Sequence, residues 1–108
     1  MFCLAGFTLK AQTAKELIGK WKLVKETKNG VVSEPKETYQ VFMEDGVFQG
    51  ISGDKSRKGK WTLSADNKEL TIKISIISLK FDVEYFDASK RIITNDKTGK
   101  LEYQKVPN

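Results

Sequence analysis

Bulky apolar and polar side chains alternate along most of this chain, from residue 20 almost to the C-terminus. Alternation with a period of two is typical of a β-strand that has one face in a core and the other in water. Turn-forming residues recur about every ten positions, as in all-β domains with short connections. The pattern predicts strands at residues 20–27, 38–43, 47–52, 60–64, 69–75, 80–86, 91–95 and 100–106.

Eight antiparallel strands joined by short turns can close on themselves, which leaves no sheet edge exposed. We therefore predict an all-β fold, an eight-stranded antiparallel up-and-down barrel. Val31 and Val32 prolong the first hairpin before Pro35 interrupts it. The capping-box pair Thr13 and Glu16 predicts a short N-terminal helical turn, which would cover one end of the barrel.

The hairpin formed by the fifth and sixth strands predicts a specific register. With its tip at residues 77–78, the apolar face pairs Ile74 with Phe81, Ile72 with Val83 and Leu70 with Tyr85. The polar face then places Lys73 opposite Asp82, which is a favourable cross-strand pair.

Gly-Lys-Trp occurs twice, at residues 19–21 and 59–61, and each copy begins an alternating segment. With Phe42-x-x-Asp45-Gly46-x-Phe48 between them, these motifs resemble the bacterial lipocalin-like domain family over residues 17–106. The resemblance implies a small calycin-type β-barrel in which Trp21 seals the closed end. It also implies a basic side chain over the Trp21 ring, supplied by Lys105 or Arg91.

One face of the strands gathers the residues that we expect to point into the barrel. The predicted ligand-binding residues are Trp21, Leu23, Phe42, Phe48, Trp61, Leu63, Ile72, Ile74, Phe81, Val83, Tyr85 and Tyr103, with Leu70 and Leu101 on the same face. Two interpretations stay open: the side chains line a pocket for a small hydrophobic molecule, or they fill the interior themselves. In the second and third strands, Tyr39, Val41 and Met43 form a rival inward face.

Composition argues against several kinds of chemistry. The 108 residues suit one domain, of which 39% are hydrophobic and 31% charged. Histidine is absent and the only cysteine is Cys3, so most metal sites, Ser–His and Cys–His nucleophiles and a disulfide framework are excluded. Asp82 and Glu84 share a strand face that we interpret as solubilising. We therefore expect a protein that is not an enzyme and uses no metal or cofactor.

The chain carries 19 basic and 14 acidic residues, a net charge of +5. Lys55, Arg57, Lys58 and Lys60 cluster around a glycine-bounded loop, which either contacts a phosphate or carboxylate group or is simply solvated. The cluster has no interleaved aromatic residue for base stacking, so we expect no nucleic-acid partner. An oligonucleotide-binding (OB) fold would suit the size and charge, but it requires five longer strands.

The segment 76–79 is apolar where a hairpin tip is normally polar. In one interpretation, Ile76, Ile77 and Leu79 form a lip at the barrel mouth that touches a ligand, a partner or a membrane. In the other, the strand runs longer and buries them.

Residues 1–12 differ from the rest of the chain, because an apolar run is followed by a small residue, Ala11. This pattern predicts a truncated signal peptide, with residues 13–108 as the barrel domain. The other interpretation is an N-terminal strand at 2–9. The run is too short to span a bilayer, so we expect no stable membrane insertion.

Taken together, the sequence predicts an exported monomer, periplasmic or secreted, that binds a small hydrophobic ligand inside a lipocalin-like barrel. The alternative is a cell-envelope structural or protein-interaction module with a filled barrel and no small ligand.

Overall fold

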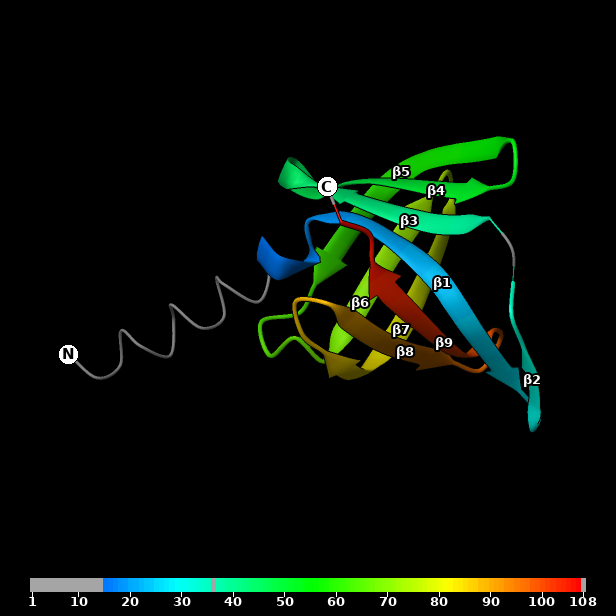
Figure 1. The fold of residues 1–108 in the computed structure, drawn as a ribbon. Coiled ribbons are helices and arrows are strands. Elements are labelled where there is room, and N and C mark those ends of the chain that lie inside the picture. The colour runs from blue at the N-terminus through cyan, green and yellow to red at the C-terminus, as the bar shows by residue number, and fades with distance from the viewer. Residues whose placement is uncertain (1–14, 36, 108) are drawn as a thin grey trace.

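The computed structural model describes residues 15–35 and 37–107, and it is dominated by one antiparallel sheet (Figure 1). The strands are β1 (Gly19–Lys28), β2 (Val31–Ser33), β3 (Thr38–Met43), β4 (Val47–Ser52), β5 (Lys55–Leu63), β6 (Glu69–Ile74), β7 (Ile77–Phe86), β8 (Lys90–Asn95) and β9 (Gly99–Lys105). A short 3-10 turn, η1 (Glu44–Gly46), joins β3 to β4. In the part of the chain that the structure describes, no helix is long and apolar enough to cross a membrane.

The sheet closes into the predicted eight-stranded up-and-down barrel. From β3 to β9 each strand pairs with the next along the chain, and β1 pairs with both β3 and β9. The short strand β2 lies outside this ring and pairs with the end of β1, where Lys28 is opposite Val31 (Figure 1). The first hairpin is therefore prolonged as predicted. The alternative of a five-stranded OB fold is wrong, because the ring contains eight strands.

Strand β5 begins at Lys55, five residues before the predicted start at residue 60. Its polar residues suggest a loop, but they pair fully with β4, from Ser52 opposite Lys55 to Val47 opposite Lys60. Charged side chains near the end of a barrel remain in water on both faces, so this part of the strand shows no apolar alternation.

The hairpin of β6 and β7 has a different register from the predicted one. Its turn is Ser75–Ile76, and Leu70 pairs with Phe81, Ile72 with Leu79 and Ile74 with Ile77. The predicted pairing was therefore wrong by four residues. The apolar face survives because an even shift leaves every side chain on its own side. The Lys73–Asp82 pair does not form, since Lys73 is opposite Ser78 and Asp82 is opposite Glu69.

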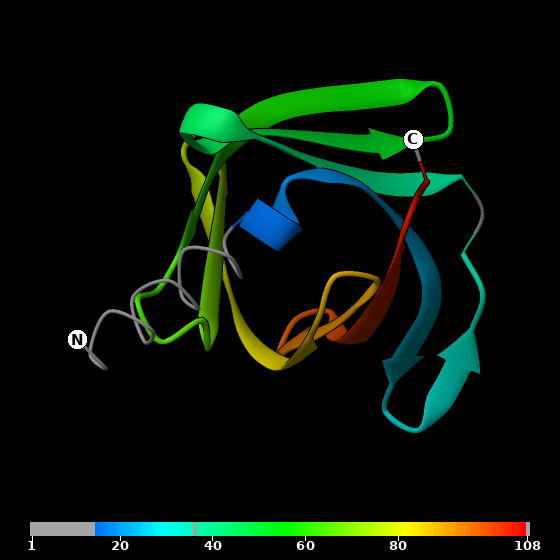
Figure 2. The ribbon, with the colours of Figure 1, turned by 60° about the vertical axis from the view of Figure 1, so that its left-hand side comes forward.

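One half of the interior is densely packed around Trp21. The Trp21 side chain is 0% exposed, and Leu17 of the adjoining helical turn is 1% exposed. The Trp21 Nε1 group donates a hydrogen bond of 2.9 Å to the Leu17 carbonyl. Figure 2 shows the helical turn of residues 15–17 lying within the outline of the ring of strands. The turn therefore covers this end of the barrel, as predicted, although Thr13 lies outside the described residues.

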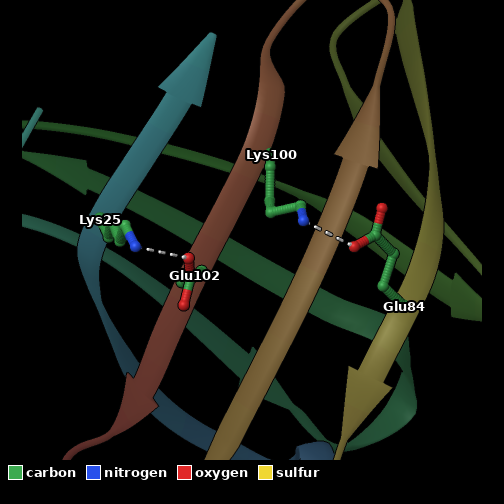
Figure 3. Close-up of polar contacts among 4 residues, drawn as sticks. All are labelled: Lys25, Glu84, Lys100 and Glu102. Carbon is green, nitrogen blue, oxygen red and sulfur yellow. Dashed lines mark ion pairs between the residues drawn. The ribbon is translucent and has the colours of Figure 1, made fainter. Parts of the chain in front are cut away.

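Two ion pairs link strands on the outer surface of the barrel (Figure 3). Lys25 of β1 is 3.7 Å from Glu102 of β9, and Lys100 of β9 reaches across β8 to Glu84 of β7 at 3.3 Å. Exposed pairs of this kind contribute about 0.2–1 kcal/mol. Both lysines therefore lie on the outer surface of the barrel.

Candidate functional site

The two ends of the barrel differ in construction. The helical turn of residues 15–17 lies at one end, and the turn between β4 and β5 lies at the other (Figure 1). We call the first the closed end and the second the open end. Strand alternation carries the same inward face from one end to the other, so the candidate site follows from what fills each half.

Both glycines of the repeated Gly-Lys-Trp motif have a structural reason. Gly19 has a φ of 132°, and a Cβ at this position would lie 2.6 Å from the Lys105 side chain. Gly59 has no unusual φ, but a Cβ there would lie 2.2 Å from the Lys73 carbonyl oxygen of the neighbouring strand. The second tryptophan, Trp61, donates from Nε1 to the Met43 carbonyl at 2.9 Å. The first glycine is therefore required by its backbone conformation and the second by the close approach of the neighbouring strand.

A buried arginine lies in the middle of the barrel. Arg91 is 1% exposed, and its guanidinium carbon lies 4.3 Å from the ring centroid of Tyr103, 4.8 Å from Phe42 and 5.0 Å from Trp21. Its Nη2 group donates to Gln40 Oε1 at 2.7 Å. No described group accepts a hydrogen bond from Nε or Nη1. Aromatic faces therefore provide most of the stabilisation of this charge.

Lys105 approaches the same tryptophan. Its Nζ lies 4.7 Å from the Trp21 ring centroid and donates to the Glu16 carbonyl at 2.5 Å. The expected cation over Trp21 is therefore confirmed, with Arg91 and Lys105 both supplying it. Burial lowers the pKa of Arg91 to about 10 and also lowers the pKa of Lys105.

A cavity of about 360 Å³ occupies the open half of the barrel. Phe48, Ile74 and Tyr103 line its wall, and Gln40 lines it close to Arg91. Gly50 also lines it and contributes no side chain, which leaves space opposite Arg57. Burial raises the pKa of Tyr103 to about 12, so its hydroxyl stays protonated at neutral pH.

The predicted site residues separate into groups. The residues that line the cavity are Phe48 and Tyr103, which also belong to the buried core, and Ile74, which packs against that core. The residues buried in the packed core are Trp21, Leu23, Phe42, Ile72 and Phe81, together with Leu70 and Leu101. The residues that pack against this core while partly exposed are Trp61, Leu63 and Val83. The structure thus contains both a filled half and a cavity, which the sequence offered as alternatives.

The inward orientation predicted for Tyr85 is wrong. Val83 pairs with Ile93 and Tyr85 with Ile92, so Glu84 is an extra residue in a β-bulge. The bulge reverses the alternation and leaves Tyr85 46% exposed, with its hydroxyl donating to Asp87. Phe86 takes the inward place instead, and its ring centroid is 6.2 Å from that of Trp21.

The rival faces of β3 and β4 are resolved by burial. Phe42 and Phe48 are 1% and 2% exposed, so their face is the inward one. Tyr39 lies on the face of Lys20, whose Nζ is 4.4 Å from the Tyr39 ring centroid. Gln40 is the inward residue that sequence reasoning missed, because a polar residue gives no apolar signal.

Two of the predicted basic residues also belong to the cavity. Lys55 and Arg57 line it, whereas Lys58 and Lys60 do not. Extending the alternation of Gly59 and Trp61 back to residue 55 would have predicted that Lys55 and Arg57 lie on the inward face. The polar composition of the segment concealed the strand.

The apolar hairpin tip remains exposed. The strand does run longer than predicted, since β7 begins at Ile77. Burial of the tip is wrong, however, because Ile76 is 92% exposed and Ile77 56% exposed. Leu79 is partly buried, packs against the core and pairs with Ile72, so it does not belong to the tip.

Among the described residues, no group of three or more carboxylate or cysteine side chains could hold a metal ion.

Comparison with known proteins agrees with this architecture. The sequence model of a family described as a C-terminal lipocalin-like domain matches residues 3–104. A lipocalin-like protein from Bacteroides uniformis superposes with a TM-score of 0.72 at 18% identity, covering 84% of this chain and 99% of that one. An uncharacterized protein from Bacteroides eggerthii gives a TM-score of 0.70 at 16% identity, covering 83% and 99%. No curated protein matches the sequence. At these identities the solved structures bear on the fold alone.

Proposed function

This chain belongs to the family of C-terminal lipocalin-like domains, and from that premise we propose that it binds a small, largely apolar molecule at the open end of its barrel. The cavity of about 360 Å³ is the observation that supports this function most directly. Small-molecule sites are typically concave, mostly apolar and about 300–1,000 Å³ in volume. The size of the cavity suits a compact ligand or a single short alkyl chain.

Binding would be driven by removing apolar ligand surface from water, at about 25 cal/mol per Å² buried. Phe48 and Ile74 provide the apolar wall. Two polar groups orient the ligand: the Tyr103 hydroxyl and the Gln40 amide nitrogen. The Gln40 oxygen accepts from Arg91, so the amide nitrogen is the group left to donate. Association of this kind requires no covalent step, and we propose a binding protein rather than an enzyme.

A leucine placed at position 50 would test the function directly. Gly50 has no positive φ, and a Cβ there would lie 3.4 Å from the Phe48 ring. Gly50→Leu therefore fills the cavity without backbone strain. Gln49→Leu adds the same side chain to the same strand on the opposite face, which makes it the matched control.

We expect wild type and Gln49→Leu to bind 1-decanol in calorimetric titrations and Gly50→Leu to bind it at least about tenfold more weakly, the effect of losing about 1.4 kcal/mol. Native mass spectrometry of detergent-free protein adds a search for a ligand carried from the host. Equal binding by all three proteins, or no binding by wild type, would contradict the proposal.

We further propose that the protein acts as an exported monomer. The apolar segment of residues 1–12 supports this, and its structure lies outside the described residues. N-terminal sequencing of protein recovered from the periplasm or medium should begin at Gln12. An intact Met1 in the exported fraction would contradict cleavage at Ala11.

A second candidate function is supported by the exposed hairpin tip. Ile76 and Ile77 are apolar and solvent-exposed, which suits a contact with a partner in the cell envelope. Ile77→Lys should abolish such a contact and leave 1-decanol binding unchanged. Ser78→Lys, which adds the same charge to the next residue, is the control. Loss of 1-decanol binding in Ile77→Lys alone would assign the tip to the ligand site instead.

A further inference from the structure

We propose that the ligand is an amphipathic anion, whose carboxylate or phosphate group lies at the rim of the cavity between Lys55 and Arg57. The inference rests on the proposed function and specifies its ligand class. It predicts an alkyl or acyl chain inside the open half of the barrel and a negative head group at the mouth.

The first support is the register of β5. Alternate residues of a strand share a face, so Lys55 and Arg57 continue the inward face of Gly59 and Trp61. Lys55 pairs with Ser52 and Arg57 with Gly50, at the end of the hairpin (Figure 1). Both side chains line the cavity and remain exposed to solvent. They are thus placed where a head group would emerge.

The second support is the absence of a competing anion. No carboxylate of residues 15–35 or 37–107 forms an ion pair with Lys55 or Arg57 within 4.0 Å. Among the described residues, the outer surface provides such partners for Lys25 and Lys100 (Figure 3). Two cations that no described carboxylate neutralises lie at one mouth and favour an anion, and an arginine fork matches carboxylate and phosphate oxygens in shape.

The third support is the charge of the cavity itself. Its lining contains two cations and no aspartate or glutamate. Arg91 lies beneath it, hydrogen-bonded to the Gln40 side chain of the cavity wall. The basic side chains of the lining and the buried Arg91 give the cavity a positive potential, which favours an anion over a neutral or cationic molecule of the same length.

Calorimetric titrations at neutral pH and constant ionic strength test the inference with decanoate, decyl phosphate and 1-decanol, which share a chain length. We expect at least one of the two anions to bind about tenfold more tightly than the alcohol. Arg57→Gln should weaken binding of that anion about threefold to tenfold, as loss of a charged contact does. It should weaken 1-decanol binding less than it weakens binding of that anion.

Lys58→Gln is the matched control, because it removes the same charge from the next residue of β5, outside the cavity lining. Equal weakening by Arg57→Gln and Lys58→Gln would mean attraction by net charge alone and would overturn the inference. Equal affinity for the alcohol and both anions would also overturn it, while leaving the proposed function intact. Failure of all three compounds to bind would overturn both. The preferred anion distinguishes a carboxylate from a phosphate head group.

Discussion

At the scale of single residues, Arg91 is the most unusual feature of the barrel. A buried guanidinium without a carboxylate partner loses its hydration and gains little in return unless other groups face it. Here three aromatic rings and the Gln40 oxygen provide those contacts. Because the rings come from β1, β3 and β9, one side chain on β8 links four strands of the barrel.

Replacing Arg91 by alanine should lower the free energy of unfolding by about 2–4 kcal/mol. The change leaves a cavity between the rings and an unsatisfied Gln40 oxygen. The neighbouring exposed residue provides the control, since Lys90→Ala should change stability by less than about 0.5 kcal/mol. Urea unfolding measures both. A stability loss for Arg91→Ala no larger than that of Lys90→Ala would show that the buried charge contributes nothing.

Tyr103 should make the protein sensitive to alkaline pH. Burial raises its folded-state pKa to about 12, whereas the pKa of tyrosine in an unfolded chain is about 10. Between these values the folded state binds more protons, so the contribution of Tyr103 is complete below about pH 10 and is lost as pH rises toward about 12. Integrated over that interval, the loss is about 2–3 kcal/mol.

The contribution of Arg91 to the pH dependence of stability has the opposite sign. Burial lowers the pKa of Arg91 to about 10, so the unfolded state binds more protons than the folded state at high pH. The useful measurement is therefore the difference in unfolding free energy between wild type and Tyr103→Phe. We expect wild type to lose stability relative to the variant above about pH 10, where tyrosine begins to ionise. A difference that stays constant with pH would contradict the assigned pKa.

At the scale of elements, alternation identified the inward faces well and the registers poorly. The β6–β7 face was correct although its pairing was displaced, because the period of two tolerates an even shift. The turn that sets the register lacks a glycine or asparagine signal: Ser75 adopts a φ of 58°. The predicted orientation of Tyr85 was wrong for a related reason, since no local residue type marks the bulge at Glu84. Both errors concern backbone geometry that side-chain patterns do not encode.

For a substitution at Asp82, the observed register and the register predicted from the sequence lead to opposite expectations. Asp82 is opposite Glu69, an unfavourable pair of like charges. Asp82→Lys should therefore raise the free energy of unfolding by about 0.2–1 kcal/mol. In the displaced register the new lysine would face Lys73 and lower stability. Asp82→Asn, which removes only the repulsion, should give a smaller gain in urea unfolding, and a loss with Asp82→Lys would contradict the register.

At the scale of the whole molecule, the barrel divides into a packed closed half and an open half with a cavity. The sequence could predict the barrel, the tryptophan at its closed end and the face that lines its interior. It could not predict how completely that interior is filled, because the outcome depends on where Leu17, Phe86 and Arg91 lie in three dimensions. The function proposed here rests on that division.

The most direct test is a heteronuclear NMR titration of the full chain with 1-decanol, following assigned backbone amides. We expect saturable shifts at Phe48, Ile74 and Tyr103, which line the cavity, and none at Leu17 or Leu70, which are buried in the packed half. Shifts confined to the exposed tip at Ile76 and Ile77, or no saturable shifts at all, would contradict an interior binding site.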